Sequence, residues 1–403
     1  MNTSKPSVWD SPFMKSFGSL GLAATMMSFL LILTFLGTMD QTNMGIYQAQ
    51  KKYFESWVVL DGWAPWGLPM IPLPGGMLCM IIFTLNLLVG GILRLRLSKN
   101  NFGIFVIHVG IALMMSAGLV KLLAGQEGYL RLWENQKASE YISHHEWEIS
   151  VFEADTGQIT EKTLHEEFWR GKESLTVAPA DGVPFHLNLQ FLYGNCRPQQ
   201  VTAGENLPED TEIIDDWYLK PEPMDPENER NMPGLVIWTH TGPEDAETAR
   251  EKRSFLWGGQ NYPWAFQYEG KTWVVALRKV RHSMPFTIQL DNFEKVDYPG
   301  ITMAKEFRSD VTQISEGSRR NVRIEMNDPL RDQGLILFQS SWGPPDAKPG
   351  DELFSVFAVV HNPSDHWPLY SCIIIAIGMG LAFIQKFLAY GRRQSKRLQK
   401  EAS

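Results

Sequence analysis

Long apolar runs flank a polar middle region in this chain of 403 residues. Four runs are long enough for a helix that crosses a bilayer, which takes about 20 residues. They cover approximately Phe17–Met39, Gly75–Leu93, Phe102–Ala124 and Trp367–Ala389. The first run is longer than the apolar region of a secretory signal and lacks a small-x-small cleavage site, so we expect an uncleaved span. The pattern therefore predicts a polytopic membrane protein with four transmembrane α-helices.

The region between the third and fourth runs has a different pattern. In Phe286–Asp291, apolar and polar residues alternate, which is typical of a strand with one buried face. Short strand-like runs bounded by turn residues recur at Thr272–Leu277, Pro285–Phe293, Asn321–Met326, Gly334–Gln339 and Leu353–Val360. The acidic, proline-rich stretch Pro208–Glu229 reads as an exposed loop or insertion. We therefore expect a large, mainly-β domain, either a sandwich or a barrel-like sheet.

These patterns divide the chain into three parts. Residues 1–125 form a membrane part with three helices, residues 126–366 form the β-rich domain, and residues 367–403 hold the fourth helix and a basic tail. Cytoplasmic loops carry an excess of Lys and Arg, so the basic residues predict the orientation. They gather before the first span, between the second and third spans, and after the fourth: Lys5, Lys15; Arg94, Arg96, Lys99; Arg392, Arg393, Lys396, Arg397, Lys400. Both termini are thus expected in the cytoplasm and the β-rich domain on the outer, extracytoplasmic side.

Composition excludes several classes of protein. A net charge of −8 argues against a nucleic-acid binder, which needs a basic face. The three cysteines, Cys79, Cys196 and Cys372, stand far apart, so there is no CxxC pair, no Cys-based zinc site and no disulfide-stapled fold. Phosphate-binding glycine loops, nucleophile elbows and HExxH helices are also missing from the sequence. No catalytic residue is predicted.

His108 is the main candidate functional residue in the sequence. It lies inside the third apolar run, about 9 Å from the expected cytoplasmic end at a rise of 1.5 Å per residue. An ionisable residue within a span is costly and marks a functional site by default, and a neutral imidazole can ligate haem iron. It can equally hydrogen-bond a neighbouring helix. Gly103 and Gly110 flank it on nearly the same face, where we expect a flat macrocycle or another helix to approach closely.

Other candidates have ordinary explanations beside the functional ones. His144 and His145 begin the β-rich domain, and His361 with His366 can hold a metal or a haem edge, although such histidines are more often only polar surface groups. The aromatic loop Trp57–Trp66 fits an interfacial belt better than a platform for a flat ligand. Met114 and Met115 fit apolar filling better than soft metal ligation.

Several segments, in order, resemble the ResB family of cytochrome c biogenesis proteins. Leu36–Gln41, Gly45–Phe54, Asn86–Leu97 and Phe102–Met114 resemble its first three spans and their connections, and Glu127–Tyr141 its entry to the outer domain. The most extended similarity covers Phe286–Phe307 with Arg308–Val311, followed by Ile324–Leu330, Gly334–Trp342 and Asn362–Cys372. The chain resembles the ResB half alone, because no tryptophan-rich haem-handling signature ending in Trp-Asp, typical of the family's partner, is found.

The resemblance implies a function that the residues alone do not supply. Together with a ResC/CcsA-type membrane partner, a ResB protein moves haem outward and presents it to apocytochrome c (system II). There the haem joins the cysteines of a Cys-x-x-Cys-His motif, so the complex, rather than this chain alone, acts as a cytochrome c haem lyase. His108 matches the family's intramembrane histidine, an axial ligand of haem b bound transiently and shared with the partner. The alternative is a structural or assembly subunit of a respiratory membrane complex, in which His108 packs and no haem binds.

Overall fold

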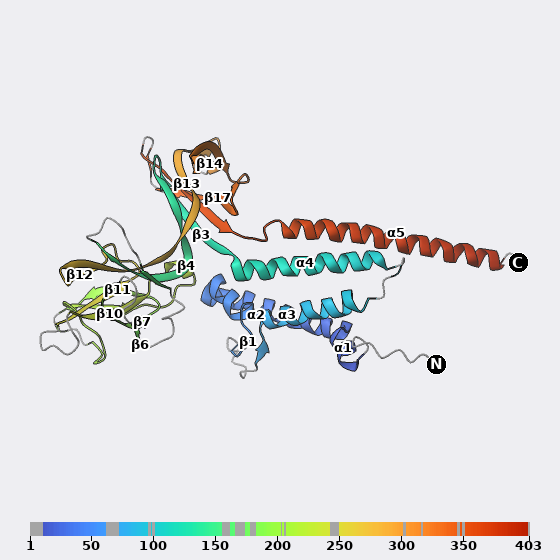
Figure 1. Cartoon of the computed structure of the whole chain (residues 1–403), viewed down its shortest axis with the longest axis horizontal. Coiled ribbons are helices and arrows are strands. Elements are labelled where there is room, and N and C mark those ends of the chain that lie inside the picture. The colour runs from blue at the N-terminus through green and yellow to red at the C-terminus, as the bar shows by residue number, and fades with distance from the viewer. Residues whose placement is uncertain are drawn as a thin grey trace. The chain divides into compact units, whose positions relative to one another are not determined.

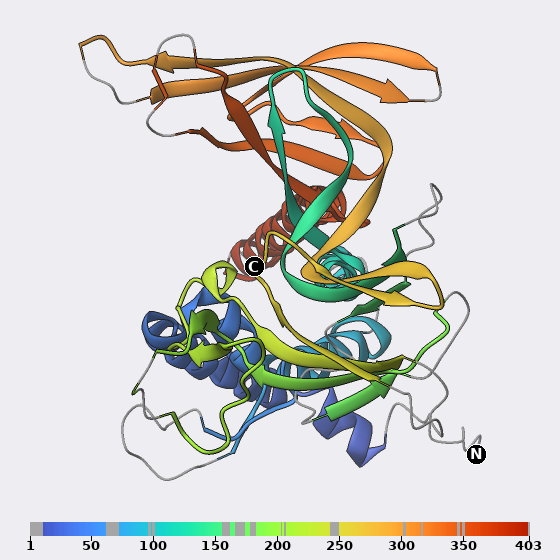
Figure 2. The same ribbon diagram turned by 90° about the vertical axis from the view of Figure 1, so that its left-hand side faces the viewer.

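The computed structural model describes residues 11–61, 72–95, 98, 101–154, 162–165, 174–177, 183–202, 204, 207–241, 250–300, 304–315, 317–344, 347–348 and 351–401. The chain divides into two compact units (Figures 1 and 2). We call Met1–Gly125 with Asn362–Ser403 the helical unit, and Gln126–His361 the β unit.

The helical unit contains the apolar helices. Its elements are α1 (Pro12–Phe17), α2 (Leu20–Tyr53), the short strands β1 (Val58–Val59) and β2 (Leu73–Pro74), α3 (Gly76–Asn86), the π-helix η3 (Leu87–Leu93), α4 (Phe102–Ala124) and α5 (Trp367–Glu401). Among the described residues, four helices are long and apolar enough to cross a membrane, namely α2, α3 with η3, α4 and α5. The prediction of a polytopic membrane protein with four helices is confirmed.

The helix bounds differ from the predicted runs at three places. Phe17, the predicted start of the first span, is the last residue of α1, and α2 begins at Leu20. α2 continues past Met39 to Tyr53, with a kink at Gly45, whose backbone (φ 80°, ψ 166°) is not helical. The residues after Met39 are too polar to be predicted as part of a membrane span. Many of them are good helix formers, however, so the helix continues beyond the apolar run. α5 likewise continues beyond Ala389 into the basic tail.

Helices α4 and α5 lie side by side (Figure 1), and small residues line their contact. A Cβ added at Gly110 would lie 2.6 Å from Ile375, and one added at Gly378 would lie 2.8 Å from the backbone nitrogen of Ile107. Gly103 approaches the backbone of Ala382 in the same way. Close approach at small residues is the usual basis of helix association in lipid.

The described residues of the β unit form strands and a short 3₁₀-helix, η5 (Asn228–Arg230). Its strands are β3 (Gln126–Trp133), β4 (Lys137–Glu153), β5 (Lys162–His165), β6 (Ser174–Val177), β7 (Leu187–Tyr193), β8 (Cys196–Gln200), β9 (Trp217–Pro221), β10 (Gly234–Thr241), β11 (Arg250–Trp257), β12 (Trp264–Tyr268), β13 (Lys271–Asp297), β14 (Ala304–Ser315), β15 (Ser318–Glu325), β16 (Leu330–Asp332), β17 (Leu335–Gly343) and β18 (Phe354–His361). The predicted mainly-β domain is therefore confirmed.

The strands form open sheets and not a closed barrel. Ten strands make the large sheet, in the order β15-β14-β13-β4-β3-β18-β17-β16 with β12 and β5 attached, and four make the sheet β11-β10-β7-β6. One apolar core lies among β3, β13–β18 and the start of β4, around Ile288, Leu290 and Phe357. A second core lies between the four-stranded sheet and the halves of β4 and β13 that carry Trp147 and Trp273.

The long strands β4 and β13 join these two cores, and β13 runs from one to the other in Figure 2. The predicted strands Thr272–Leu277 and Pro285–Phe293 are both parts of β13, because the polar residues between them stay paired with β4. The acidic stretch predicted as a loop also contains strand β9, whose Tyr218 and Leu219 are buried. All three cysteines are free, and only Cys196 lies in the β unit.

Candidate functional site

His108 lies half-buried near the start of α4, and its ring contacts the neighbouring π-helix. The Nδ1 atom is 2.8 Å from the carbonyl oxygen of Gly91 in η3. A carbonyl can only accept, so Nδ1 carries the proton in this contact and the other ring nitrogen, Nε2, keeps its lone pair. No hydrogen bond from the described residues reaches Nε2. An imidazole in this state has the donor atom that a haem iron requires.

The flanking glycines do not share the face of His108, which corrects our expectation. Gly103 and Gly110 pack against α5, whereas His108 contacts η3. Residues five positions apart on an α-helix differ in direction by about 140°, so Gly103 and His108 point to different sides. Of the two expected neighbours of these glycines, another helix is the one observed.

The π-helix η3 is anchored by polar and close backbone contacts. The side-chain amide of Asn86 donates to the carbonyls of Phe17 and Ser19, between α1 and α2. Gly90 lies against Gly18, so that a Cβ on Gly90 would sit 2.5 Å from the Gly18 carbonyl oxygen. These contacts hold the segment that presents the Gly91 carbonyl to His108.

Histidine, cysteine and carboxylate side chains do not cluster into a metal site in the part of the chain that the structure describes. Among the described residues, no group of three or more His, Cys, Asp or Glu side chains is placed to hold a metal ion. His361 ends strand β18 in the β unit, whereas His366 belongs to the helical unit, where its exposed ring is 3.4 Å from Asp365. The role of His108 as a haem ligand therefore stays a prediction.

His144 and His145 contact each other, with ring centroids 5.9 Å apart, and each also contacts another side chain. They lie in a bulge of β4 opposite Val280, where the register with β13 shifts. The His144 ring lies 5.3 Å from the Tyr129 ring, and His145 is 3.6 Å from the carboxylate of Glu229. The predicted polar role therefore describes this pair better than metal binding.

Nearby, His282 pairs with Glu146 at 3.9 Å. Burial lowers the pKa of His282, while the charges of Glu146 and Glu148 partly oppose this effect. The ring is therefore neutral near pH 7 and packs against Tyr141.

The helical unit contains an ionic cluster that was not predicted from the sequence. The side chain of Lys52 donates to Asp40 at 2.9 Å and lies 3.1 Å from Asp61, and the Tyr53 hydroxyl donates to Asp40 at 3.0 Å. In a straight helix the 12 residues from Asp40 to Lys52 would span about 18 Å. The kink at Gly45 brings them together, and a glycine between an apolar run and a charged segment was the available signal.

The aromatic loop is only partly described. Trp57 is exposed, whereas residues 62–66 of the predicted Trp57–Trp66 loop lie outside the described residues. Met115 accepts a weak hydrogen bond from Thr84 of α3 at 3.8 Å, which suits its expected role as packing between spans.

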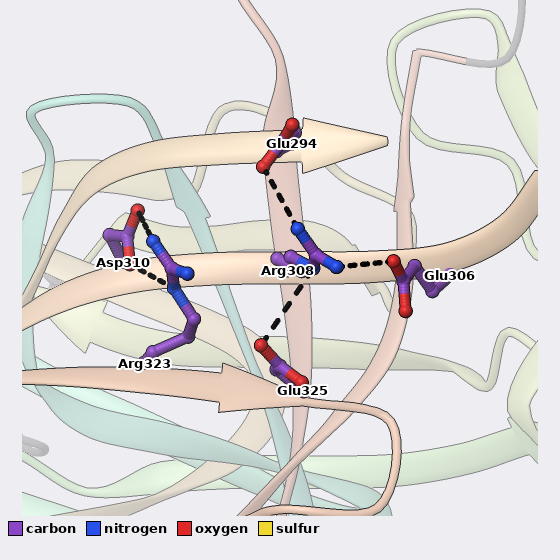
Figure 3. Close-up of polar contacts among 6 residues, drawn as sticks. All are labelled: Glu294, Glu306, Arg308, Asp310, Arg323 and Glu325. Atoms are coloured by element: carbon purple, nitrogen blue, oxygen red, sulfur yellow. Dashed lines mark hydrogen bonds and ion pairs between the residues drawn. The ribbon is translucent and has the colours of Figure 1, made fainter. Parts of the chain in front are cut away.

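The segment with the most extended family resemblance forms a ladder of charges across β13, β14 and β15 (Figure 3). Arg308 lies between Glu294 and Glu325, at 3.7 Å from each, and also contacts Glu306. Beside it, Arg323 donates two hydrogen bonds to Asp310. The paired charges indicate a structural role for this part of the sheet.

The comparison with family models identifies the chain. The model of the ResB-like family matches residues 98–349, which include α4 with His108 and nearly all of the β unit. The chain belongs to the ResB-like family. Comparison with curated proteins gives no match.

Membership in the ResB-like family places this chain in cytochrome c biogenesis, where ResB proteins work with membrane partners. The matched range ends before α5 and begins after η3, so the Gly91 carbonyl lies outside it. The resemblance inferred from the sequence is confirmed.

Proposed function

We propose that this ResB-like protein is a subunit of a membrane complex that carries haem b outward and presents it to apocytochrome c. The contact between His108 Nδ1 and the Gly91 carbonyl carries the proposal, because it leaves Nε2 available for iron inside an apolar helix. Haem is the cargo of this complex and is held only transiently. When bound, it supplies the vinyl groups that form thioethers with the cytochrome.

The second axial ligand comes from a ResC/CcsA-type partner. This assignment is supported by the sequence, in which His108 is the only histidine within the four apolar runs. A ligand on each protein makes haem retention depend on the assembled complex. Sharing the haem between two chains also allows its release to the cytochrome.

The proposed orientation puts both termini in the cytoplasm and the β unit on the outer side of the cytoplasmic membrane. The support is the distribution of Lys and Arg over the short loops and the C-terminal tail. In this orientation the β unit can receive the apocytochrome, and an exposed sheet edge such as β15 suits pairing with an extended segment.

Two replacements of His108 test the haem proposal. His108→Ala removes the ring and leaves a good helix former, whereas His108→Asn keeps an amide N–H that can donate to Gly91 and lacks the iron-binding nitrogen. We expect both variants to insert normally and to lower bound haem and cytochrome c assembly by about tenfold or more, since even lost support of a metal ligand costs about 10–100-fold. Imidazole in the medium should partly restore the alanine variant.

The control is Ser116→Ala, because the Ser116 hydroxyl only bonds the carbonyl of Ala112 within the same helix. Haem spectra of the complex purified with its partner, and the cellular content of c-type cytochromes, are the measurements. If His108→Asn supports normal assembly at a normal protein level, His108 serves only as a helix contact. The chain would then fit the structural-subunit alternative.

A further inference from the structure

We propose that the carbonyl of Gly91 is the positioning group of His108: it holds the imidazole in the tautomer with the proton on Nδ1 and so makes Nε2 the iron-binding atom. The inference rests on the proposed haem function and names the group that orients the ligand. Two independent features of η3 support it.

The first feature is a backbone acceptor that the helix itself leaves available. η3 ends at Leu93, two residues after Gly91, so the Gly91 carbonyl lies in the last turn. The last carbonyls of a helix have no intrahelical donor and need a partner from elsewhere. Within an apolar span an unpaired carbonyl is costly, and the Nδ1–H of His108 supplies a donor at 2.8 Å.

The second feature is the missing side chain at position 91. A Cβ built on Gly91 would lie 2.9 Å from Nδ1 and 3.1 Å from Cγ of His108, and 3.1 Å from a methyl of Leu87. These separations are shorter than ordinary van der Waals contact, so an alanine would push the ring away from the carbonyl. Glycine at this position thus lets the imidazole reach the backbone.

The chemical consequence concerns how strongly His108 binds iron. A ligating histidine that donates its other N–H to a carbonyl is fixed in tautomer and ring direction, and its free nitrogen becomes a better donor. Loss of such a partner typically costs about 10–100-fold in metal affinity. The π-helix, a local feature often found at functional sites, provides the carbonyl here.

The test begins with haem-free protein, so that it does not depend on the proposed function. The full chain with its partner is labelled with ¹⁵N-histidine, and the His108→Ala variant assigns the His108 signals. We expect a protonated Nδ1 and an unprotonated Nε2 at neutral pH. A His108 signal showing protonated Nε2 and bare Nδ1 would overturn the inference, whatever haem does.

The variant Gly91→Ala then tests the positioning role, with Gly118→Ala as the matched control in α4, where an added Cβ meets nothing within 4 Å. We expect Gly91→Ala to shift the His108 nitrogen signals, to weaken haem binding by about 10–100-fold and to convert part of the haem to high spin. Gly118→Ala should change none of these. Unchanged nitrogen signals and haem spectrum in Gly91→Ala would overturn the inference.

Different results would contradict the haem proposal and the positioning role of Gly91. If His108→Ala keeps its haem while the wild-type tautomer is as expected, the haem proposal fails and the contact with Gly91 stands as helix packing. If Gly91→Ala does not accumulate, the wild-type tautomer measurement still decides whether Nε2 is the available atom.

Discussion

Burial controls the chemistry of individual residues in the β unit, and Cys196 is the clearest example. Its sulfur is buried in β8, 3.6 Å from the carbonyl oxygen of Met232. Burial, with a smaller contribution from the charge of Glu222, raises the pKa of the Cys196 thiol to about 12. A thiol in this environment is a small apolar group and not a nucleophile.

We therefore predict that Cys196 resists alkylation in the folded protein. At pH 8 a rise in pKa from 9.0 to about 12 lowers the thiolate fraction by about a thousandfold. Mass spectrometry of the Cys196 peptide after treatment with iodoacetamide should show slow labelling in the native protein and ordinary labelling in guanidinium chloride. Rapid native labelling would contradict the placement of this residue.

The same shift has a defined effect on stability. The folded pKa of Cys196 lies above the unfolded value, so its contribution to stability is complete below about pH 9 and is lost as the pH rises from 9 towards 12. His282 has the opposite sign, because its folded pKa is lowered. Its contribution is present above about pH 6.5 and is lost as the pH falls below that value.

Secondary-structure elements in this protein are joined by two kinds of contact. In the helical unit α4 and α5 meet through glycines, where backbone approaches backbone. In the β unit, the strands β13, β14 and β15 are matched by charge, with Arg308 directly opposite both Glu294 and Glu325. Arg308 thus contacts carboxylates on both neighbouring strands, β13 and β15, and also Glu306 on its own strand, β14.

We predict that Arg308→Ala destabilises this part of the β unit by about 0.5–1 kcal/mol, because three partly exposed carboxylates lose the cation that contacts all of them. Arg323→Ala is the matched control, since its exposed pair with Asp310 contributes little and its loss should have a smaller effect. Pulse proteolysis of the full chain in detergent, over a range of guanidinium chloride concentrations, measures both. Equal losses in the two variants would refute the role assigned to Arg308.

At the level of the whole molecule, a helical unit is interrupted in sequence by a β unit. Residues 126–361 leave the membrane part after α4 and return to it before α5. The arrangement requires the ends of α4 and α5 that adjoin the β unit to be on one side of the bilayer, because strands β3 and β18, which connect to them, are paired along their whole length.

Reporter fusions test the orientation of this molecule. A reporter fused after Lys99 should behave as cytoplasmic, because Lys- and Arg-rich short loops stay in the cytoplasm. A reporter fused after Gly157 should behave as exported, because one span separates the two sites. The contrast between alkaline phosphatase and a cytoplasmic fluorescent reporter at the two sites is the measurement. Cytoplasmic behaviour at both sites would disprove the proposed topology.

Much of this architecture was predictable from the sequence because hydropathy and alternation are local properties. Four apolar runs predicted the four helices, and Phe102–Ala124 matches α4 residue for residue. The alternating apolar residues of Phe286–Leu290 predicted a strand whose inward face is buried. His108 was predictable as a candidate functional residue because it is the histidine inside a span, and an imidazole is costly in hydrocarbon wherever the helix packs.

Only the tertiary structure decided what those elements contact. The hydrogen-bond acceptor for His108 is a backbone carbonyl 17 residues away in the sequence, and a backbone group has no side-chain pattern that predicts such a contact. The same holds for the kink at Gly45, which brings Asp40 and Lys52 together. It also holds for β13, in which pairing with β4 joins two predicted strands into one. The physical reason is that hydropathy and periodicity report which side of an element is apolar, whereas hydrogen bonds and close backbone approach depend on which other element comes to lie against it.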